Sequence, residues 1–235
     1  QRVGPAPHDA PPGDAAVARM GLAEVVAALR AHVAVARVAQ MACGRLGILC
    51  EPIGSEQAAA EAGVIEAVVE TLRAHRQEED VQKDGCRVLQ NVSFGNDAAS
   101  DARCQRAAAA GAIEEVVAAL RAHAQEEGVQ ENGCAVLANV CCGDDARRQR
   151  AAAAGAIEDV VAAMRAHPQE EKVQMMSCGA LSNICGGGSG VRARRRRATQ
   201  AGGRAVAVAA MQAHPDNDGV QDYGRRVLIR LPAEV

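Results

Sequence analysis

The sequence predicts an all-α, right-handed superhelical solenoid of about five three-helix repeats. The first observation behind this is repetition, because the segment Ala107–Val140 recurs almost unchanged at Ala151–Ile184 and again at Ala59–Val92. Weaker copies lie at Met20–Leu49 and Ala201–Leu231. The second observation is that the apolar residues of each copy follow a helical spacing, whereas no segment alternates with the period of a strand.

The helix that forms the middle of each repeat is marked by an apolar stripe. Ile113, Val116, Val117 and Leu120 stand at positions i, i+3, i+4 and i+7, which places them on one helix face. The same pattern recurs at 22–29, 65–72 and 157–164. A glycine that can break the chain comes just before three of the copies, at Gly63, Gly111 and Gly155. A proline follows two of them, at Pro168 and Pro215.

Two further helices complete the unit. We expect one from about Glu127 to Val140 and its equivalents, and a shorter, Ala-rich helix over Arg103–Ala110 and Arg147–Ala154. We place the repeats at about residues 20–50, 56–95, 101–143, 146–186 and 192–231, within an array that spans 20–235. The outer two copies are expected to act as caps. Residues 1–19 are rich in proline and lack an apolar period, which predicts a flexible lead-in.

These residues resemble the armadillo repeat. The turn Gly111-Ala112-Ile113, the run Val116-Val117 with Leu120, and the third-helix pattern Val129-Gln130, Leu137 and Asn139-Val140 match its motifs. The match is specific in the middle three repeats and covers roughly residues 20–231. The resemblance implies a non-catalytic interaction scaffold, like the arrays found in large signalling proteins. It also implies that an extended segment of a partner protein binds in a concave groove lined by the third helices.

The resemblance assigns a role to the asparagines Asn91, Asn139 and Asn183, which share one third-helix position. In similar armadillo proteins this asparagine points into the groove and holds the backbone of the bound peptide. A side-chain amide offers both a donor and an acceptor, so it can replace a neighbouring strand. The alternative is that each asparagine bonds the end of a neighbouring helix and keeps the repeats in register.

Specificity is expected from the same helix face, one and two turns before the asparagine. These positions, with Arg230 in the asparagine's place in the last repeat, are Asp84, Arg87, Asn132, Ala135, Met176, Gly179, Tyr223 and Arg226. Nuclear-import adaptors of the family carry Trp one turn before the asparagine, whereas this chain has Arg, Ala or Gly there. Recognition of nuclear-localisation peptides is therefore not expected. Arg226 and Arg230 suggest that one end of the groove could hold an acidic group of the ligand.

A second function is suggested by a basic patch. Arg192, Arg194, Arg195, Arg196 and Arg197 fall on the first helix of the last repeat. Such a cluster could bind nucleic acid or an acidic surface. However, arginines recur on the equivalent helices, no aromatic residues are interleaved, and the chain as a whole carries a net charge of −3. A solvated helix face is the simpler interpretation, and nucleic-acid binding stays open as the alternative.

Composition limits the remaining classes. Aromatic residues make up 1% of the chain, so the core must consist of small aliphatic side chains and cysteines. Seven of the nine cysteines recur at two inward positions, and the cysteines are expected to pack in the core rather than to bind a metal. The recurring histidines, His32, His75, His123, His167 and His214, are expected to satisfy carbonyls of the last helical turn.

No nucleophile motif or pair of catalytic carboxylates breaks the repeat pattern, so we expect neither an enzyme nor a cofactor. No apolar run reaches the length of a membrane span. With no signal peptide recognised and an odd number of cysteines, we expect a monomer in the cytoplasm or nucleus.

Overall fold

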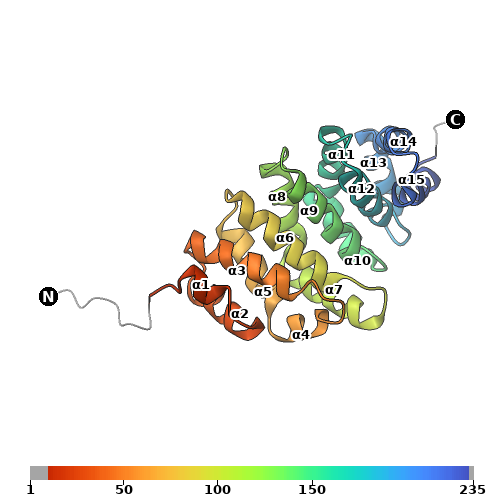
Figure 1. The fold of residues 1–235 in the computed structure, drawn as a ribbon. Coiled ribbons are helices and arrows are strands. Elements are labelled where there is room, and N and C mark those ends of the chain that lie inside the picture. The colour runs from red at the N-terminus through yellow and green to blue at the C-terminus, as the bar shows by residue number, and fades with distance from the viewer. Residues whose placement is uncertain (1–9, 233–235) are drawn as a thin grey trace.

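The computed structural model describes residues 10–232 and contains, within them, fifteen helices in five successive triplets (Figure 1). The first helices of the triplets are α1 (Asp14–Val17), α4 (Glu56–Glu61), α7 (Ala98–Ala110), α10 (Asp145–Ala154) and α13 (Val191–Ala201). The second helices are α2 (Leu22–Ala31), α5 (Val64–Ala74), α8 (Ala112–Ala122), α11 (Ala156–Ala166) and α14 (Gly203–Ala213). The third helices are α3 (Ala36–Leu49), α6 (Glu79–Ser93), α9 (Glu127–Val140), α12 (Glu171–Ile184) and α15 (Asp218–Arg230).

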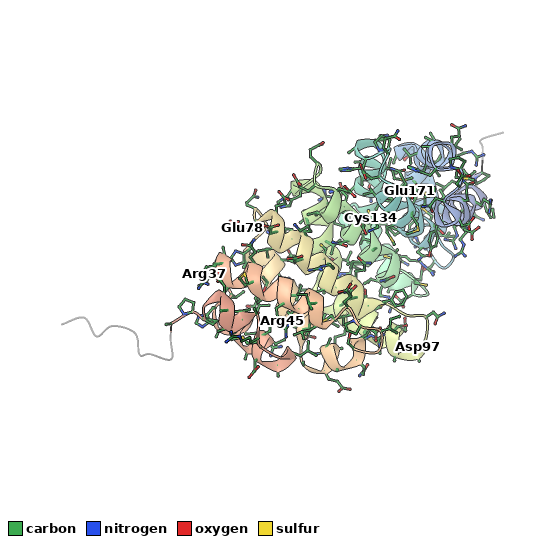
Figure 2. All side chains as sticks on the ribbon, viewed as in Figure 1. Arg37, Arg45, Glu78, Asp97, Cys134 and Glu171 are labelled. Carbon is green, nitrogen blue, oxygen red and sulfur yellow. The ribbon has the colours of Figure 1, made fainter. Side chains whose placement is uncertain are left out.

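The third helices pack on one another in chain order and form one continuous layer, here called the third-helix layer. Its helices begin along one edge of the solenoid, where Glu78 and Glu171 lie, whereas Asp97 lies along the opposite edge, just before α7 (Figure 2). The predicted third helix, from Glu127 to Val140, has the bounds of α9. The all-α solenoid predicted from the repeat pattern is confirmed.

The core is built from the predicted small side chains. Ile113, Val116, Val117 and Leu120 of α8 are at most 2% exposed. The cysteines that recur in the third helices, such as Cys134, are fully buried between successive repeats. The prediction that the cysteines are core residues is confirmed for eight of the nine, and the exception is the exposed Cys142.

The start of the array lies earlier than predicted. Residues 14–17 form α1, Val17 is fully buried, and Asp14 pairs with Arg37 of α3. The prediction of a flexible lead-in over 1–19 is therefore wrong for this part, since an apolar residue and an ion pair fix it; residues 1–9 lie outside the described residues. Helix α7 also begins before the predicted repeat boundary of 101, because Asp97 caps it by accepting from the backbone N of Ser100 at 2.8 Å.

The predicted glycine breaks are confirmed. Gly63, Gly111 and Gly155 adopt left-handed conformations with φ of 81°, 100° and 98°, and they separate the first helix from the second. The arginine near the end of the preceding repeat's second helix reaches this turn, as Arg121 does when it donates to Ala154 O at 2.8 Å. A Cβ on Gly155 would lie 2.2 Å from Nη2 of Arg121, so only glycine fits there without displacing this arginine.

The recurring histidines join successive repeats. Nε2 of His123 lies 2.8 Å from Arg76 O, and Nε2 of His167 lies 2.9 Å from Ala124 O. His75 and His214 make the same contact with Val33 O and Pro168 O. Each acceptor is a carbonyl, so the ring nitrogen donates. The predicted role in the last turn of the same helix is thus corrected, because the ring reaches the carbonyl that follows the preceding repeat's histidine.

A recurring glutamine caps each of four second helices. Gln82, Gln130, Gln174 and Gln221 lie near the starts of the third helices. Nε2 of Gln130 donates at 3.0 Å to both Leu120 O and His123 O, which are carbonyls at the end of α8. The side chain of Gln130 satisfies two carbonyls that the helix itself leaves without a donor. It is 1% exposed, so water cannot replace it.

Replacing this capping amide should weaken the solenoid. Gln130→Ala removes both donors and leaves two buried carbonyls unsatisfied, which should lower the free energy of unfolding by about 2 kcal/mol. Urea denaturation followed by circular dichroism measures the change. The matched control is Gln212→Ala, which alters an exposed side chain of α14 and should change the stability by less than about 0.5 kcal/mol. Equal stability of the two variants would contradict the capping role.

The thiols should differ in reactivity. Burial raises the pKa of Cys134 and Cys141 to about 12, and that of Cys50 to about 11. A raised pKa keeps the thiol protonated until the pH approaches that value, and only the thiolate reacts with alkylating agents. At pH 8 we expect iodoacetamide to label Cys142 rapidly and the eight buried cysteines only after unfolding, as read by mass spectrometry. Rapid labelling of Cys134 in the folded protein would contradict the packing.

Candidate partner-binding surface

The predicted groove residues lie on the third-helix layer, and at its N-terminal end they enclose a hollow. Met41, Gly44 and Ile48 of α3 face Asp84 and Arg87 of α6 across a cavity of about 410 Å³. Arg87 donates to Asp84 Oδ1 at 3.0 Å, so this pair forms a polar wall opposite an apolar one. Ile48, which replaces the asparagine in the first repeat, is 55% exposed.

The middle of the layer is more closed than the sequence suggests. Ala135 is 2% exposed, and Asn132 donates to Lys83 O of α6 at 3.2 Å. Gly179 lies under the ring of Tyr223, because a Cβ on this glycine would be 3.8 Å from the ring carbons. Ala135 and Gly179 therefore offer no side chain to a partner. Sequence reasoning missed this because it assigned the positions to a helix face without the neighbouring helix that covers them.

Other predicted residues reach the surface near the C-terminal end of the third-helix layer. Met176 and Tyr223 are half-buried. The guanidinium of Arg226 lies over the Tyr223 ring, 5.2 Å from its centroid, which is a cation–π arrangement. These side chains and Arg230 surround the C-terminal end of the third-helix layer.

The asparagines make contacts between repeats. Nδ2 of Asn139 donates to Gln90 O at 3.2 Å, and Nδ2 of Asn183 donates to Ala138 O at 2.8 Å. Each acceptor is on the preceding third helix, which is the register contact that the sequence left as an alternative. Nδ2 of Asn139 also donates to Ser93 Oγ at 3.4 Å, so Asn139 keeps only its carbonyl oxygen, whereas Asn183 keeps one N–H and its carbonyl oxygen. Neither oxygen is buried without a partner. The side chain of Asn91 makes no hydrogen bond within the described residues.

Arg230 takes the asparagine's place in the last repeat. It donates to Ser182 O and to Ser182 Oγ of α12, which is the bond that the asparagines make one repeat earlier. The contact that holds the third helices in register thus continues with a charged donor. Its positive charge adds to that of the arginines on α13.

The basic patch divides into structural and free arginines. Arg194 is 3% exposed and donates to Ile184 O at 2.8 Å and to Asp145 Oδ1 at 2.8 Å. Arg197 pairs with Glu158 of α11. These two residues therefore belong to the packing between repeats, and the prediction that all five arginines form one surface patch is wrong for them.

The structural roles of Arg194 and Arg197 recur in other repeats, and this recurrence in the sequence could have identified them. Arg103 and Arg147 bond the end of the preceding third helix as Arg194 does, at Val92 O and Val140 O. Arg106 and Arg150 pair with Glu66 and Glu114 of the preceding second helix as Arg197 does with Glu158.

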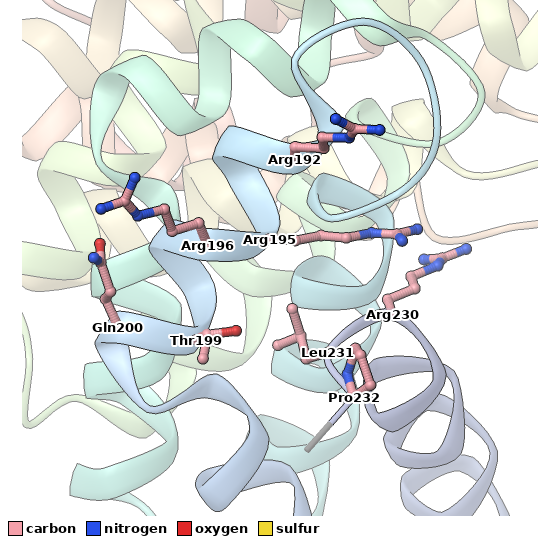
Figure 3. Close-up of a pocket in the computed structure, with 8 residues that line it drawn as sticks. All are labelled: Arg192, Arg195, Arg196, Thr199, Gln200, Arg230, Leu231 and Pro232. Atoms are coloured by element: carbon pink, nitrogen blue, oxygen red, sulfur yellow. The ribbon is translucent and has the colours of Figure 1, made fainter. Parts of the chain in front are cut away.

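The remaining arginines of the patch border a second hollow. Its volume is about 660 Å³, and its lining includes Arg192, Arg195, Arg196 and Arg230. Figure 3 shows Arg195 and Arg230 pointing to the same side, whereas Arg196 points away from them across α13. Sequence reasoning named all of these residues but could not bring Arg230 of α15 beside Arg195.

The described residues contain neither a candidate metal site nor a candidate membrane span. Residues 10–232 contain no group of three or more His, Cys, Asp or Glu side chains that could hold a metal ion. Over the same residues no helix combines the length and the apolar character that crossing a membrane requires.

Comparisons with known proteins identify the fold. No family model matches the sequence, and no curated protein matches it closely. Among solved structures, an engineered protein superposes with a TM-score of 0.69 at 23% identity, over 94% of this chain and 90% of its own. A designed armadillo repeat protein in complex with the peptide (KR)4 gives a TM-score of 0.68 at 21% identity, over 95% of this chain and 89% of its own.

A further solved structure matches over a smaller share of its own chain. A structure from a study of the cadherin and β-catenin interaction gives a TM-score of 0.77 at 17% identity, over 90% of this chain and 37% of that one. The identities are low, so these likenesses concern the fold and not the ligands. The chain has the armadillo-repeat fold, a right-handed solenoid of three-helix repeats.

Proposed function

We propose that the protein is a non-catalytic interaction module whose third-helix layer binds an extended segment of a partner protein. The observation that carries the proposal is the row of amides Asn91, Asn139 and Asn183, which stand at one position of three successive third helices. After their contacts within the protein are made, Asn91 and Asn183 retain at least one N–H and the carbonyl oxygen, and Asn139 retains its carbonyl oxygen.

An extended peptide suits this row because its backbone carries unsatisfied N–H and C=O groups along both edges. An amide that accepts from one peptide N–H and donates to one C=O replaces a strand neighbour without selecting a side chain. The bonds from Asn139 and Asn183 to the preceding helix hold these amides in fixed orientations, which lowers the entropy lost on binding.

The hollow between α3 and α6 supplies a place for a side chain of the segment. Met41 and Ile48 form an apolar wall, and burying an apolar side chain there would contribute about 1.5–3 kcal/mol. The exposure of Ile48 in the free protein supports this use, because its burial on binding would be favourable. The Asp84–Arg87 pair beside it favours a polar neighbour in the segment.

The designed armadillo repeat protein that was solved with a peptide shows that this fold can hold one. That case supports the class of ligand and not its sequence. The free thiols at buried positions further support a reducing compartment, which we infer to be the cytoplasm or the nucleus.

The proposal predicts that the amide row controls peptide affinity. Peptides selected from a random display library on the wild-type protein should bind Asn91→Ala/Asn139→Ala/Asn183→Ala several tens-fold more weakly, at about 1 kcal/mol for each amide. Fluorescence anisotropy measures the affinities. Circular dichroism and urea denaturation must first show that the triple variant remains folded, because two of the amides also join repeats.

Two controls separate binding from stability. Asn91→Ala alone removes no hydrogen bond of the fold and should still weaken the peptides severalfold, whereas Asn96→Ala in the exposed loop after α6 should not. Methylating the backbone nitrogens of a bound peptide should also reduce its affinity, since it removes the N–H groups that donate to the asparagine carbonyl oxygens. Unchanged affinity in the triple variant would refute the proposal.

A further inference from the structure

The C-terminal end of the third-helix layer holds a cluster of guanidinium groups, here called the arginine hollow. Arg192 and Arg195 of α13 and Arg230 of α15 line it. Arg148 of α10 and Arg226 of α15 lie near enough to influence the ionisation of Arg230. These side chains come from three different helices, so the cluster is a product of the tertiary fold.

The charges of this cluster are not neutralised by carboxylates. Within residues 10–232 none of the five arginines forms an ion pair with Asp or Glu, whereas the neighbouring Arg194 and Arg197 both do. The bonds that orient the cluster go to neutral carbonyls at the ends of the third helices. Nε of Arg195 donates to Cys185 O at 3.1 Å, and Nε of Arg148 donates to Cys141 O at 3.1 Å.

These bonds fix the guanidiniums and leave other N–H groups free. An arginine has five N–H donors, of which Arg148 uses two on the protein and Arg195 uses one. Burial and the charge of Arg148 lower the pKa of Arg230, which indicates repulsion that a bound anion would relieve. The hollow of about 660 Å³ is open to such a group.

We propose that the arginine hollow binds the phosphate of a phosphorylated serine or threonine in the partner segment that lies on the third-helix layer. This rests on the proposed function, because it assigns one residue type to that segment. A phosphate carries a charge of about −1.5 to −2 and three acceptor oxygens, so it can pair with guanidiniums that approach from several helices. A carboxylate has one charge and two oxygens, and it would leave part of the cluster unpaired.

A protein ligand fits the hollow better than nucleic acid. None of the residues that line it is aromatic, so no base can stack there. Arg194 and Arg197 bond other parts of the protein, so the remaining arginines form one compact positive site. A nucleic-acid backbone would instead need positive charges spread along several successive phosphates. Arg230 also holds the position of the asparagine row, so the hollow is continuous with the surface proposed for the segment.

The test uses O-phosphoserine as the probe, followed by NMR of the backbone amides. We expect shifts confined to residues around Arg195 and Arg230, and an affinity at least fivefold higher than that of aspartate, which has a carboxylate in place of the phosphate. The variant Arg195→Gln/Arg230→Asn should bind the probe at least tenfold more weakly. Asparagine at 230 restores the residue of the other repeats and can still donate to Ser182 O, so the fold is expected to persist.

The matched control is Arg19→Gln/Lys172→Gln, which removes the same charge at two exposed positions, one after α1 and one at the start of α12, and should bind like the wild type. No localised shift, equal binding of aspartate, or equal loss in the control variant would each overturn the proposal. The result is independent of the amide row. If the probe binds but the asparagine variants keep their peptides, the proposed function fails and phosphate binding in the arginine hollow stands. If the probe does not bind but the asparagine variants lose their peptides, only the arginine hollow is refuted.

Discussion

Side-chain hydrogen bonds to backbone carbonyls hold each repeat against the one before it, and the rest of the structure depends on them. The core offers small side chains, and most of its larger members are Leu and Ile. Burial of small side chains releases less free energy per residue than burial of aromatic ones. It also specifies the angle and register of stacked helices less sharply. The bonds from His123, Gln130 and Asn139 define the angle and register of the stacked helices, since each bond forms only when its acceptor lies at the right position.

These contacts use carbonyls that helices cannot satisfy themselves. The last turn of every helix leaves its C=O groups without donors. In this protein glutamine serves the second helix, whereas arginine serves the end of the third, as Arg147 does at Val140 O. A solenoid contains many helix ends, and each of them would expose polar groups at a repeat interface. The polar residues that recur with the repeat are therefore largely explained by helix termination.

These bonds within the fold also determine which hydrogen-bonding groups remain for a partner. Asn139 and Asn183 serve both the fold and, in our proposal, a ligand, because each amide has more hydrogen-bonding groups than its contacts within the fold use. Arginine has a still larger capacity, so Arg195 and Arg230 can be oriented by carbonyls and retain donors for an anion. Arg194 shows the other outcome, because its donors are spread over an aspartate and four carbonyls and it is buried.

The sequence by itself determined the helices, their order and their buried stripes. Periodicity, glycine turns and proline stops are local signals, and they placed α9 at its observed bounds and Ile113 in the core. It also named most residues of both candidate surfaces, the asparagine row by its recurrence and the arginines of α13 by their clustering. The start of the array escaped this reasoning, since α1 is a short helix fixed by Val17 and Asp14, which depend on contacts with the rest of the first repeat.

Only the tertiary structure decided which polar residues are free. Arg194 and Arg195 are adjacent in the chain and differ by about 100° around the helix. What each meets is set by the end of α12, which belongs to the preceding repeat. In the same way Tyr223 covers Gly179, and Arg230 comes beside Arg195 from another helix. A repeating sequence specifies each helix face, whereas the neighbour that covers or opens that face is specified by the stacking of the repeats.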